Sequence, residues 1–90
     1  MTNDRISEIS RRLRRALDPV ELDIEDQSHL HAGHIGAKEG KGHFEVMIVS
    51  NQFEGLSRIA RHRLVYDALG DFMNEHIHAL SINALSPSER

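Results

Sequence analysis

The run His43–Ser50, HFEVMIVS, restricts the fold of this chain more than any other stretch. Its second half is apolar at both alternating sets of positions, with Val46 and Ile48 in one set and Met47 and Val49 in the other. A strand that is apolar on both faces belongs inside a sheet, where other elements cover it. The run therefore predicts a central, buried strand, and the rest of the chain must supply its neighbours and its cover.

Two further segments have the pattern of strands. Residues 20–25 alternate apolar and acidic side chains, which predicts one face toward the core and one acidic face. The apolar face consists of Val20, Leu22 and Ile24, and the acidic face of Glu21, Asp23 and Glu25. Residues 77–85, IHALSINAL, predict a third strand with Leu80 and Ile82 on one face. These two segments are the expected neighbours of the central strand.

Two segments have the periodicity of helices. In residues 4–17, apolar side chains recur at spacings of three and four, and Pro19 marks the end of the helix. A second helix is predicted from a cap at Ser57 to about Glu75, after a turn around Gly55. Its apolar stripe is Leu64, Val65, Ala68, Leu69, Phe72 and Met73.

The order of these elements, α-β-β-α-β, predicts an α+β fold in one domain of residues 1–90. The first two strands can form an antiparallel hairpin, whereas a helical crossover makes the third strand parallel. We expect a two-layer sandwich with a three-stranded mixed sheet and both helices on one face. Residues 27–42 are the predicted loop and residues 86–90 a tail. The acidic sheet face would meet water or a partner.

The predicted loop contains three of the seven histidines and four of the six glycines. His29, His31 and His34 could form part of a metal site, because imidazole binds several transition metals. Their spacing matches no zinc-protease pattern, so an exposed polar loop is the alternative interpretation. The literal GxxG at residues 33–36 lies between predicted strands, whereas the nucleic-acid-binding GxxG of KH domains joins two helices. We therefore do not interpret it as a nucleic-acid-binding motif.

Two other sets of residues carry potential chemistry. His78 has the parity of Leu80 and Ile82, which predicts a side chain under the helices at the edge of the core, with a structural hydrogen bond. The start of the second helix is basic, and such a helix either contacts phosphates or forms a solvated face. Its residues are Arg58, Arg61, His62 and Arg63.

Composition excludes several classes of protein. The chain has no cysteine, so it forms no disulfide and supplies no thiolate to a metal or cluster. No nucleotide-binding fingerprint or nucleophile elbow is present, and we expect no enzymatic activity. The apolar runs are too short to cross a bilayer, and no signal-peptide core follows Met1. We therefore expect a soluble cytoplasmic protein.

Four motifs in order resemble the signature of the BolA family. They are HFxVxIVS from His43, FxGxS from Phe53, RHRxVY from Arg61 and HALxI from His78. The resemblance extends from about Arg5 to Pro87. It implies an α-β-β-α-β fold related to the type II KH class, and this order agrees with the one read from periodicity.

The resemblance also implies a function. BolA proteins pair with monothiol glutaredoxins, and the pair can share a 2Fe-2S cluster in iron–sulfur trafficking or iron homeostasis. The thiolates come from the glutaredoxin and glutathione, so we expect no cofactor in the isolated chain. We expect the free chain to be a monomer or a weak homodimer. The family's last-strand ligand falls on His78. Its loop ligand falls on His31 or His34, with His29 a weaker match, and His43 is interpreted as structural.

The alternative function that the resemblance implies is regulation of transcription. Bacterial members are described as DNA-binding regulators that use the region around the second helix. On this chain that surface falls on the four basic residues from Arg58 to Arg63. The net charge of −3 and the low aromatic content, 4%, do not favour single-strand binding.

Overall fold

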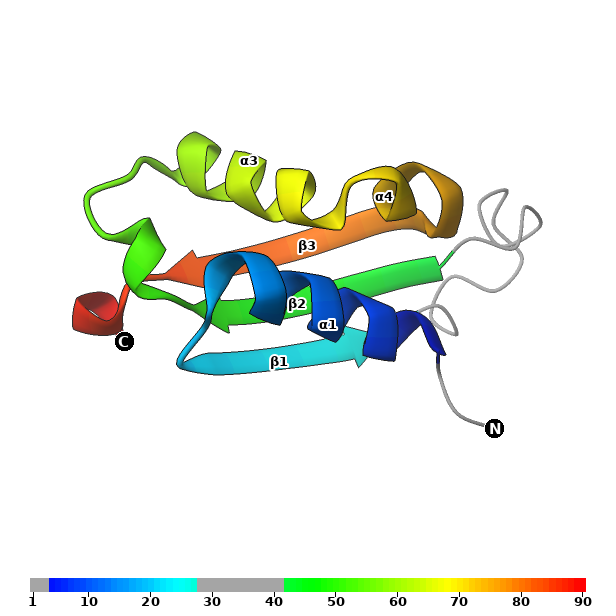
Figure 1. Ribbon diagram of the computed structural model, residues 1–90, viewed down its shortest axis with the longest axis horizontal. Coiled ribbons are helices and arrows are strands. Elements are labelled where there is room, and N and C mark those ends of the chain that lie inside the picture. Colours follow the sequence, from blue (N-terminus) through cyan, green and yellow to red (C-terminus); the bar gives the residue numbers. More distant parts are fainter. Residues whose placement is uncertain (1–3, 28–41) are drawn as a thin grey trace.

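The computed structural model describes residues 4–27 and 42–90. Its main elements are α1 (Asp4–Leu17), β1 (Glu21–Asp26), β2 (Gly42–Val49), α3 (Arg58–Leu69), α4 (Asp71–His76) and β3 (Ile77–Leu85). Two short 3-10 turns, η2 (Asn51–Phe53) and η3 (Pro87–Glu89), follow β2 and β3. The predicted α+β fold is confirmed (Figure 1), with one change, because the second predicted helix is divided.

The sheet has the order β1-β2-β3, so the apolar strand is central as predicted. β1 and β2 are antiparallel, with Leu22 opposite Ile48, and β2 and β3 are parallel, with Val46 opposite Ile82. The helices lie on one face of the sheet, as Figure 1 shows. The mixed sheet and the two-layer arrangement thus follow the prediction, while the type II KH classification stays a prediction.

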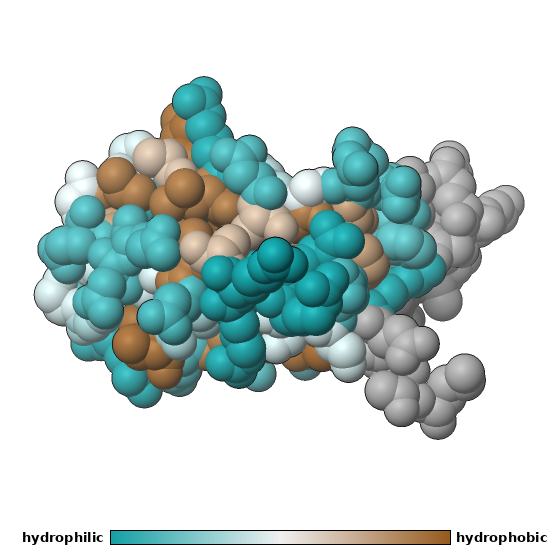
Figure 2. All heavy atoms as spheres, in the orientation of Figure 1, coloured by the Kyte–Doolittle hydropathy of each residue, from teal (hydrophilic) through white to brown (hydrophobic). Residues whose placement is uncertain are grey.

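The core lies between the helices and the inner face of the sheet. α1 contributes Ile9, Leu13 and Leu17, and the other elements contribute Phe44, Val46, Ile48, Phe53, Val65, Leu69, Phe72 and Ile77. On the other face of the sheet, Asp23, Glu25 and Glu45 are exposed, as the alternation of β1 predicted. Figure 2 views the helical side, on which hydrophilic side chains are interspersed with hydrophobic ones. The large side chains of Ile59 and Tyr66, both in α3, are exposed.

The second predicted helix does not run unbroken to Glu75. α3 ends at Leu69, and Gly70 follows with φ +55° and ψ −134°, a conformation that side chains with a Cβ rarely adopt. The Leu69 carbonyl accepts a hydrogen bond from Arg12 Nη1 at 2.8 Å, so α1 caps the end of α3. The continuous apolar periodicity across Gly70 concealed this break.

One end of the sheet differs from the prediction at two places, just before β1 and just after β3. Val20 was assigned to the core face, but it precedes β1 and is 58% exposed, because the chain is still leaving the turn after α1. Residues 86–90 are not a loose tail. Ser86 is fully buried, and its N–H donates to Glu89 Oε1 at 2.9 Å, which closes the short turn η3.

Candidate functional site

His78 is the extra residue of an irregularity in the parallel pairing of β2 and β3. Gly42 is opposite Ile77, whereas the next residue of β2, His43, is opposite Ala79. One step on β2 therefore matches two steps on β3, and His78 is the residue left over. Such bulges bend a strand and change the direction of a side chain. The bulge places His78 at the start of β3, outside the regular alternation.

The side chain of His78 is exposed, so the prediction that it lies under the helices was wrong. That prediction extended the alternation backward from Leu80 and Ile82, and both do pack against the core. The bulge interrupts the alternation, because Ile77 on the other parity is the buried residue. A histidine at this position is free to contact a partner or a ligand.

His43 lies beside His78, and the two ring centroids are 5.0 Å apart with an angle of 49° between the planes. His43 is buried, at 9% exposure, at the start of the central strand. The sequence analysis interprets His43 only as a structural residue and does not predict that it lies beside His78. The signal was available, because parallel strands that follow a crossover start at the same edge of the sheet.

The loop histidines His29, His31 and His34 lie outside the described residues. The residues that flank their segment are described, and both lie next to the histidine pair. The N–H of Gln27 donates to the carbonyl of His43 at 2.8 Å, and Gly42 is opposite Ile77. The residues on both sides of the segment 28–41 thus lie at the end of the sheet where β3 begins, next to His78.

Within residues 4–27 and 42–90, no group of three or more histidine, aspartate or glutamate side chains is placed to hold a metal ion. The imidazoles of His43 and His78 lie together at this end of the sheet, and the chain has no cysteine that could add a thiolate ligand. Only the imidazole of His78 is exposed, so the described residues offer one accessible nitrogen donor of a partial site. A complete coordination shell here needs donors from the segment 28–41 or from another molecule.

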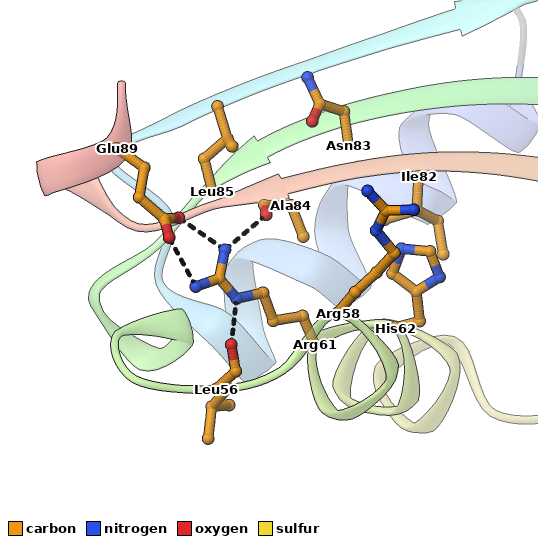
Figure 3. A pocket seen from close by; sticks show the side chains of 9 residues that line it. All are labelled: Leu56, Arg58, Arg61, His62, Ile82, Asn83, Ala84, Leu85 and Glu89. Atoms are coloured by element: carbon orange, nitrogen blue, oxygen red, sulfur yellow. Dashed lines mark hydrogen bonds and ion pairs between the residues drawn. The ribbon is translucent and has the colours of Figure 1, made fainter.

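The four basic residues predicted as a nucleic-acid or partner surface differ from one another in exposure. Arg58 and Arg63 are exposed and His62 is half-buried. The side chain of Arg61 is only 11% exposed. Its guanidinium donates to the carbonyls of Leu56 and Ala84, both at 3.0 Å, and to both carboxylate oxygens of Glu89, at 2.6 and 2.9 Å (Figure 3).

Arg61 therefore joins the start of α3 to the end of β3 and to η3. The hydrogen bond from Arg61, followed by that from the Ser86 N–H, lowers the pKa of Glu89 to about 2. Sequence reasoning assigned Arg61 to a binding surface, and it could not show that Glu89 is within reach. The exposed part of the predicted surface is formed by Arg58 and Arg63, and His62 is half-buried.

The sequence model described as BolA-like protein matches residues 13–89, which is most of the chain. The chain belongs to the BolA family. Its curated BolA relatives include Protein BOLA1, chloroplastic, of Arabidopsis thaliana, 47% identical over 89 residues, and BolA-like protein 1 of Homo sapiens, 41% identical over 81 residues. These matches cover 96% and 90% of the chain, but 56% and 57% of those proteins.

A further relative, SufE-like protein 1, chloroplastic/mitochondrial, of Arabidopsis thaliana, is 46% identical over 86 residues. That match covers 90% of this BolA chain and only 23% of the relative, so the chain is similar to one part of a longer protein. The activities and partners of those whole proteins are therefore only proposals for this chain.

Solved BolA structures have the same fold. The BolA domain of SufE1 and BolA1, both from Arabidopsis thaliana, each superpose with a TM-score of 0.84, at 44% and 45% identity. Each comparison covers 100% of this chain and 99% of that structure. No helix among the described residues has the length and apolarity needed to span a bilayer. Since the plant relatives are named chloroplastic or mitochondrial, the cytoplasmic location stays a prediction.

Proposed function

We propose that this BolA-like chain is an adaptor that pairs with a monothiol glutaredoxin and helps to hold a shared 2Fe-2S cluster. Its ligands would be His78 and one of His31 and His34. The observation that carries this proposal is the bulge at the start of β3, which leaves His78 exposed where a structural histidine would be buried. In this role the chain is not an enzyme, and when free it is a monomer or a weak homodimer in the cytoplasm.

The donor types on the two partners are complementary. A chain without cysteine supplies no thiolate, so the thiolates must come from the glutaredoxin and from glutathione. When bound, a cluster with imidazole in place of thiolate has a higher reduction potential, as in Rieske centres. His78 has to be neutral to bind iron, so assembly of the shared site should weaken at acidic pH.

The packing around His78 supports a ligand role in two ways. Ile77, its neighbour in sequence, is 4% exposed and anchors the start of β3 in the core. The ring of His43 lies against the ring of His78 and limits the directions that this imidazole can take. His78 is thus held at its backbone and on one side of its ring, while its exposed side faces solvent.

Chain length allows either loop histidine to approach His78. An extended chain spans at most about 3.6 Å per residue, so the four steps from Gln27 to His31 can span about 14 Å. The seven steps from Gln27 to His34 can span about 25 Å. The N–H of Gln27 donates a hydrogen bond to the carbonyl of His43, whose ring lies against that of His78. Both spans are therefore long enough for either loop histidine to reach His78. Chain length does not distinguish between the two histidines.

The test is reconstitution of the cluster with a monothiol glutaredoxin, glutathione, iron and sulfide, followed by visible circular dichroism. The mixture with this chain should give a spectrum different from that of the glutaredoxin alone. His78→Ala should return the spectrum to that of the glutaredoxin alone, and only one of His31→Ala and His34→Ala should do the same. The control is His62→Ala, a half-buried histidine on α3, which should keep the mixed spectrum.

The ligand assignment is wrong if His78→Ala keeps the mixed spectrum. The pairing itself is wrong if the chain and the glutaredoxin do not associate in sedimentation experiments with or without the cluster. The two outcomes are distinct, because a variant that still associates but lacks the mixed spectrum keeps the pairing and identifies the ligand.

A further inference from the structure

A groove of about 570 Å³ lies between the first half of α3 and the second half of β3 (Figure 3). Arg58 and His62 line its helical side, and Ile82 and Asn83 line its strand side. Ile82 packs against the core while its neighbour Asn83 is exposed, so the groove reaches both faces of the sheet. A groove that includes both faces of one strand lies at the edge of that strand.

The backbone of β3 along this groove has one side that no strand pairs with among the described residues. Two hydrogen bonds identify that side. The carbonyl of Leu85 accepts from the N–H of Ser50, just after β2, at 3.0 Å, whereas the carbonyl of Ala84 accepts from Arg61 at 3.0 Å. Successive residues of a strand direct their backbone groups to opposite sides. Ile82, two residues from Ala84, therefore directs its N–H and C=O away from β2 and into the groove.

Arg61 closes one end of this edge. Its guanidinium occupies the outward carbonyl of Ala84 and is itself neutralised by Glu89. The outward backbone groups at Ile82 have no such partner in the part of the chain that the structure describes. An unpaired N–H and C=O on an edge strand is a template for pairing with another extended chain.

The charge of the groove selects the chemistry of that chain. Arg58 is exposed and takes part in no ion pair among the described residues, and it projects from α3 toward β3 as does His62 (Figure 3). Among the described residues that line the groove, the only acidic one, Glu89, is already paired with Arg61. Leu56 and Ile82 add half-buried apolar surface. The groove thus offers a cation and apolar contacts beside a free strand edge.

We propose that this groove binds a short, extended, acidic segment of another protein. The segment would pair with the outward backbone groups of Ile82 as a fourth strand and place a carboxylate against Arg58. Strand addition takes its affinity from main-chain hydrogen bonds and its specificity from the alternate side chains. Ile82 is four residues from His78, or roughly 13 Å along the strand, so the segment would bind apart from the histidine pair.

Charge and composition favour a peptide over the other occupants. A second copy paired β3 to β3 would bring Arg58 and His62 against their own counterparts, and like charges at an interface oppose association. A single-stranded nucleic acid needs aromatic stacking platforms, and no phenylalanine or tyrosine lines the groove.

The test uses two labelled heptapeptides, TVEVEVT and TVKVKVT, in fluorescence anisotropy with the full chain. The acidic peptide should bind and the basic one should not. Arg58→Glu should weaken binding of the acidic peptide about tenfold, because it replaces an attraction with a repulsion. The matched control, Arg63→Glu, makes the same charge change on the same helix outside the groove and should alter the affinity less than about twofold.

Amide hydrogen exchange of the same complex tests the backbone pairing. The acidic peptide should slow exchange at Ile82, whose N–H faces the groove, and leave Asn83, which faces β2, unchanged. Unchanged exchange at Ile82 would overturn strand addition. Equal binding of the two peptides, equal effects of the two arginine variants, or stronger binding of a dT octamer than of the acidic peptide would each overturn the proposed occupant. So would self-association of the chain that slows exchange at the amide of Ile82 in the absence of peptide.

Discussion

The two ends of β3 differ in how firmly the fold holds them. At its end, the carbonyls of Ala84 and Leu85 accept hydrogen bonds from Arg61 and from Ser50, and η3 folds back through Glu89. At its start, regular pairing is interrupted by a bulge, and His78 is exposed. One end joins α1, α3 and the C-terminal turn, whereas the other presents an imidazole next to the attachment of the segment 28–41.

This difference predicts that the polar contacts that stabilise the fold and the proposed cluster ligand lie at opposite ends of the same strand. Side chains at the closed end should be costly to replace, because each satisfies backbone groups of another element. The side chain of His78 should be replaceable without loss of folding, because it is exposed. The predictions below test this division, beginning with the largest expected effect on the free energy of unfolding.

Ser50→Ala should give the largest loss among the changes at the closed end. Ser50 is fully buried, and its Oγ donates to the carbonyl of Leu17 at 2.6 Å and accepts from the N–H of Gln52 at 3.1 Å. Alanine leaves both groups without this partner, so the free energy of unfolding should fall by about 1–3 kcal/mol in urea denaturation. Ser81→Ala, at an exposed position in β3, is the control and should change it by less than about 0.5 kcal/mol. Equal losses would remove the distinction between the closed end and an ordinary strand position.

Gly70→Ala should cost about 1–2 kcal/mol in the same measurement. An added Cβ would meet no atom closer than 3.7 Å, so the cost comes from the backbone conformation and not from a clash. The variant tests whether the break between α3 and α4 is needed to deliver the chain to the start of β3. A variant as stable as the natural chain would show that α3 and α4 can continue as one helix.

Glu89→Gln should have a smaller, pH-dependent effect. Because the pKa of Glu89 is about 2 in the fold and 4.5 as its ordinary value, its ion pair stabilises the fold fully above pH 4.5. That contribution is lost as the pH falls through 2. The difference in melting temperature between the natural chain and the variant should therefore shrink from pH 7 to pH 2. The control, Asp23→Asn on the open sheet face, should show no such trend; a constant difference for Glu89→Gln would contradict the role of the ion pair.

His78→Ala should have the smallest effect on stability. Its side chain is exposed, so the free energy of unfolding should change by less than about 0.5 kcal/mol. Ile77→Ala, one residue earlier and 4% exposed, should cost about 2–4 kcal/mol because it leaves a cavity. A large loss for His78→Ala would mean that this histidine holds the start of β3, and the proposed division between the two ends would be wrong.

Much of the fold was predictable because burial has a period. The apolar run after His43 indicated a central strand, and the helical crossover required a parallel partner. The alternation in residues 20–25 placed the acidic side chains on the open face. These features depend on which residues leave water, and that information is local in the sequence.

The features that escaped prediction depend on backbone geometry or on distant partners. The bulge at Gly42 and His43 shifted the parity of His78, and no periodic pattern records a single extra residue. The break at Gly70 lies within an unbroken apolar stripe. The pairing of Arg61 with Glu89 joins residues 28 positions apart in sequence. The residues of the candidate site came from the family resemblance and stay a prediction, whereas the environment of His78 came from the structure.

The central claim is that the exposed imidazole of His78 binds the shared cluster. Pulsed electron paramagnetic resonance of the reduced complex, with the chain labelled by ¹⁵N-histidine, measures this bond directly. We expect strong couplings from two histidine nitrogens in the natural complex, and the loss of one of them, or of the mixed cluster itself, in His78→Ala. Two unchanged ¹⁵N couplings in the His78→Ala complex would contradict the claim.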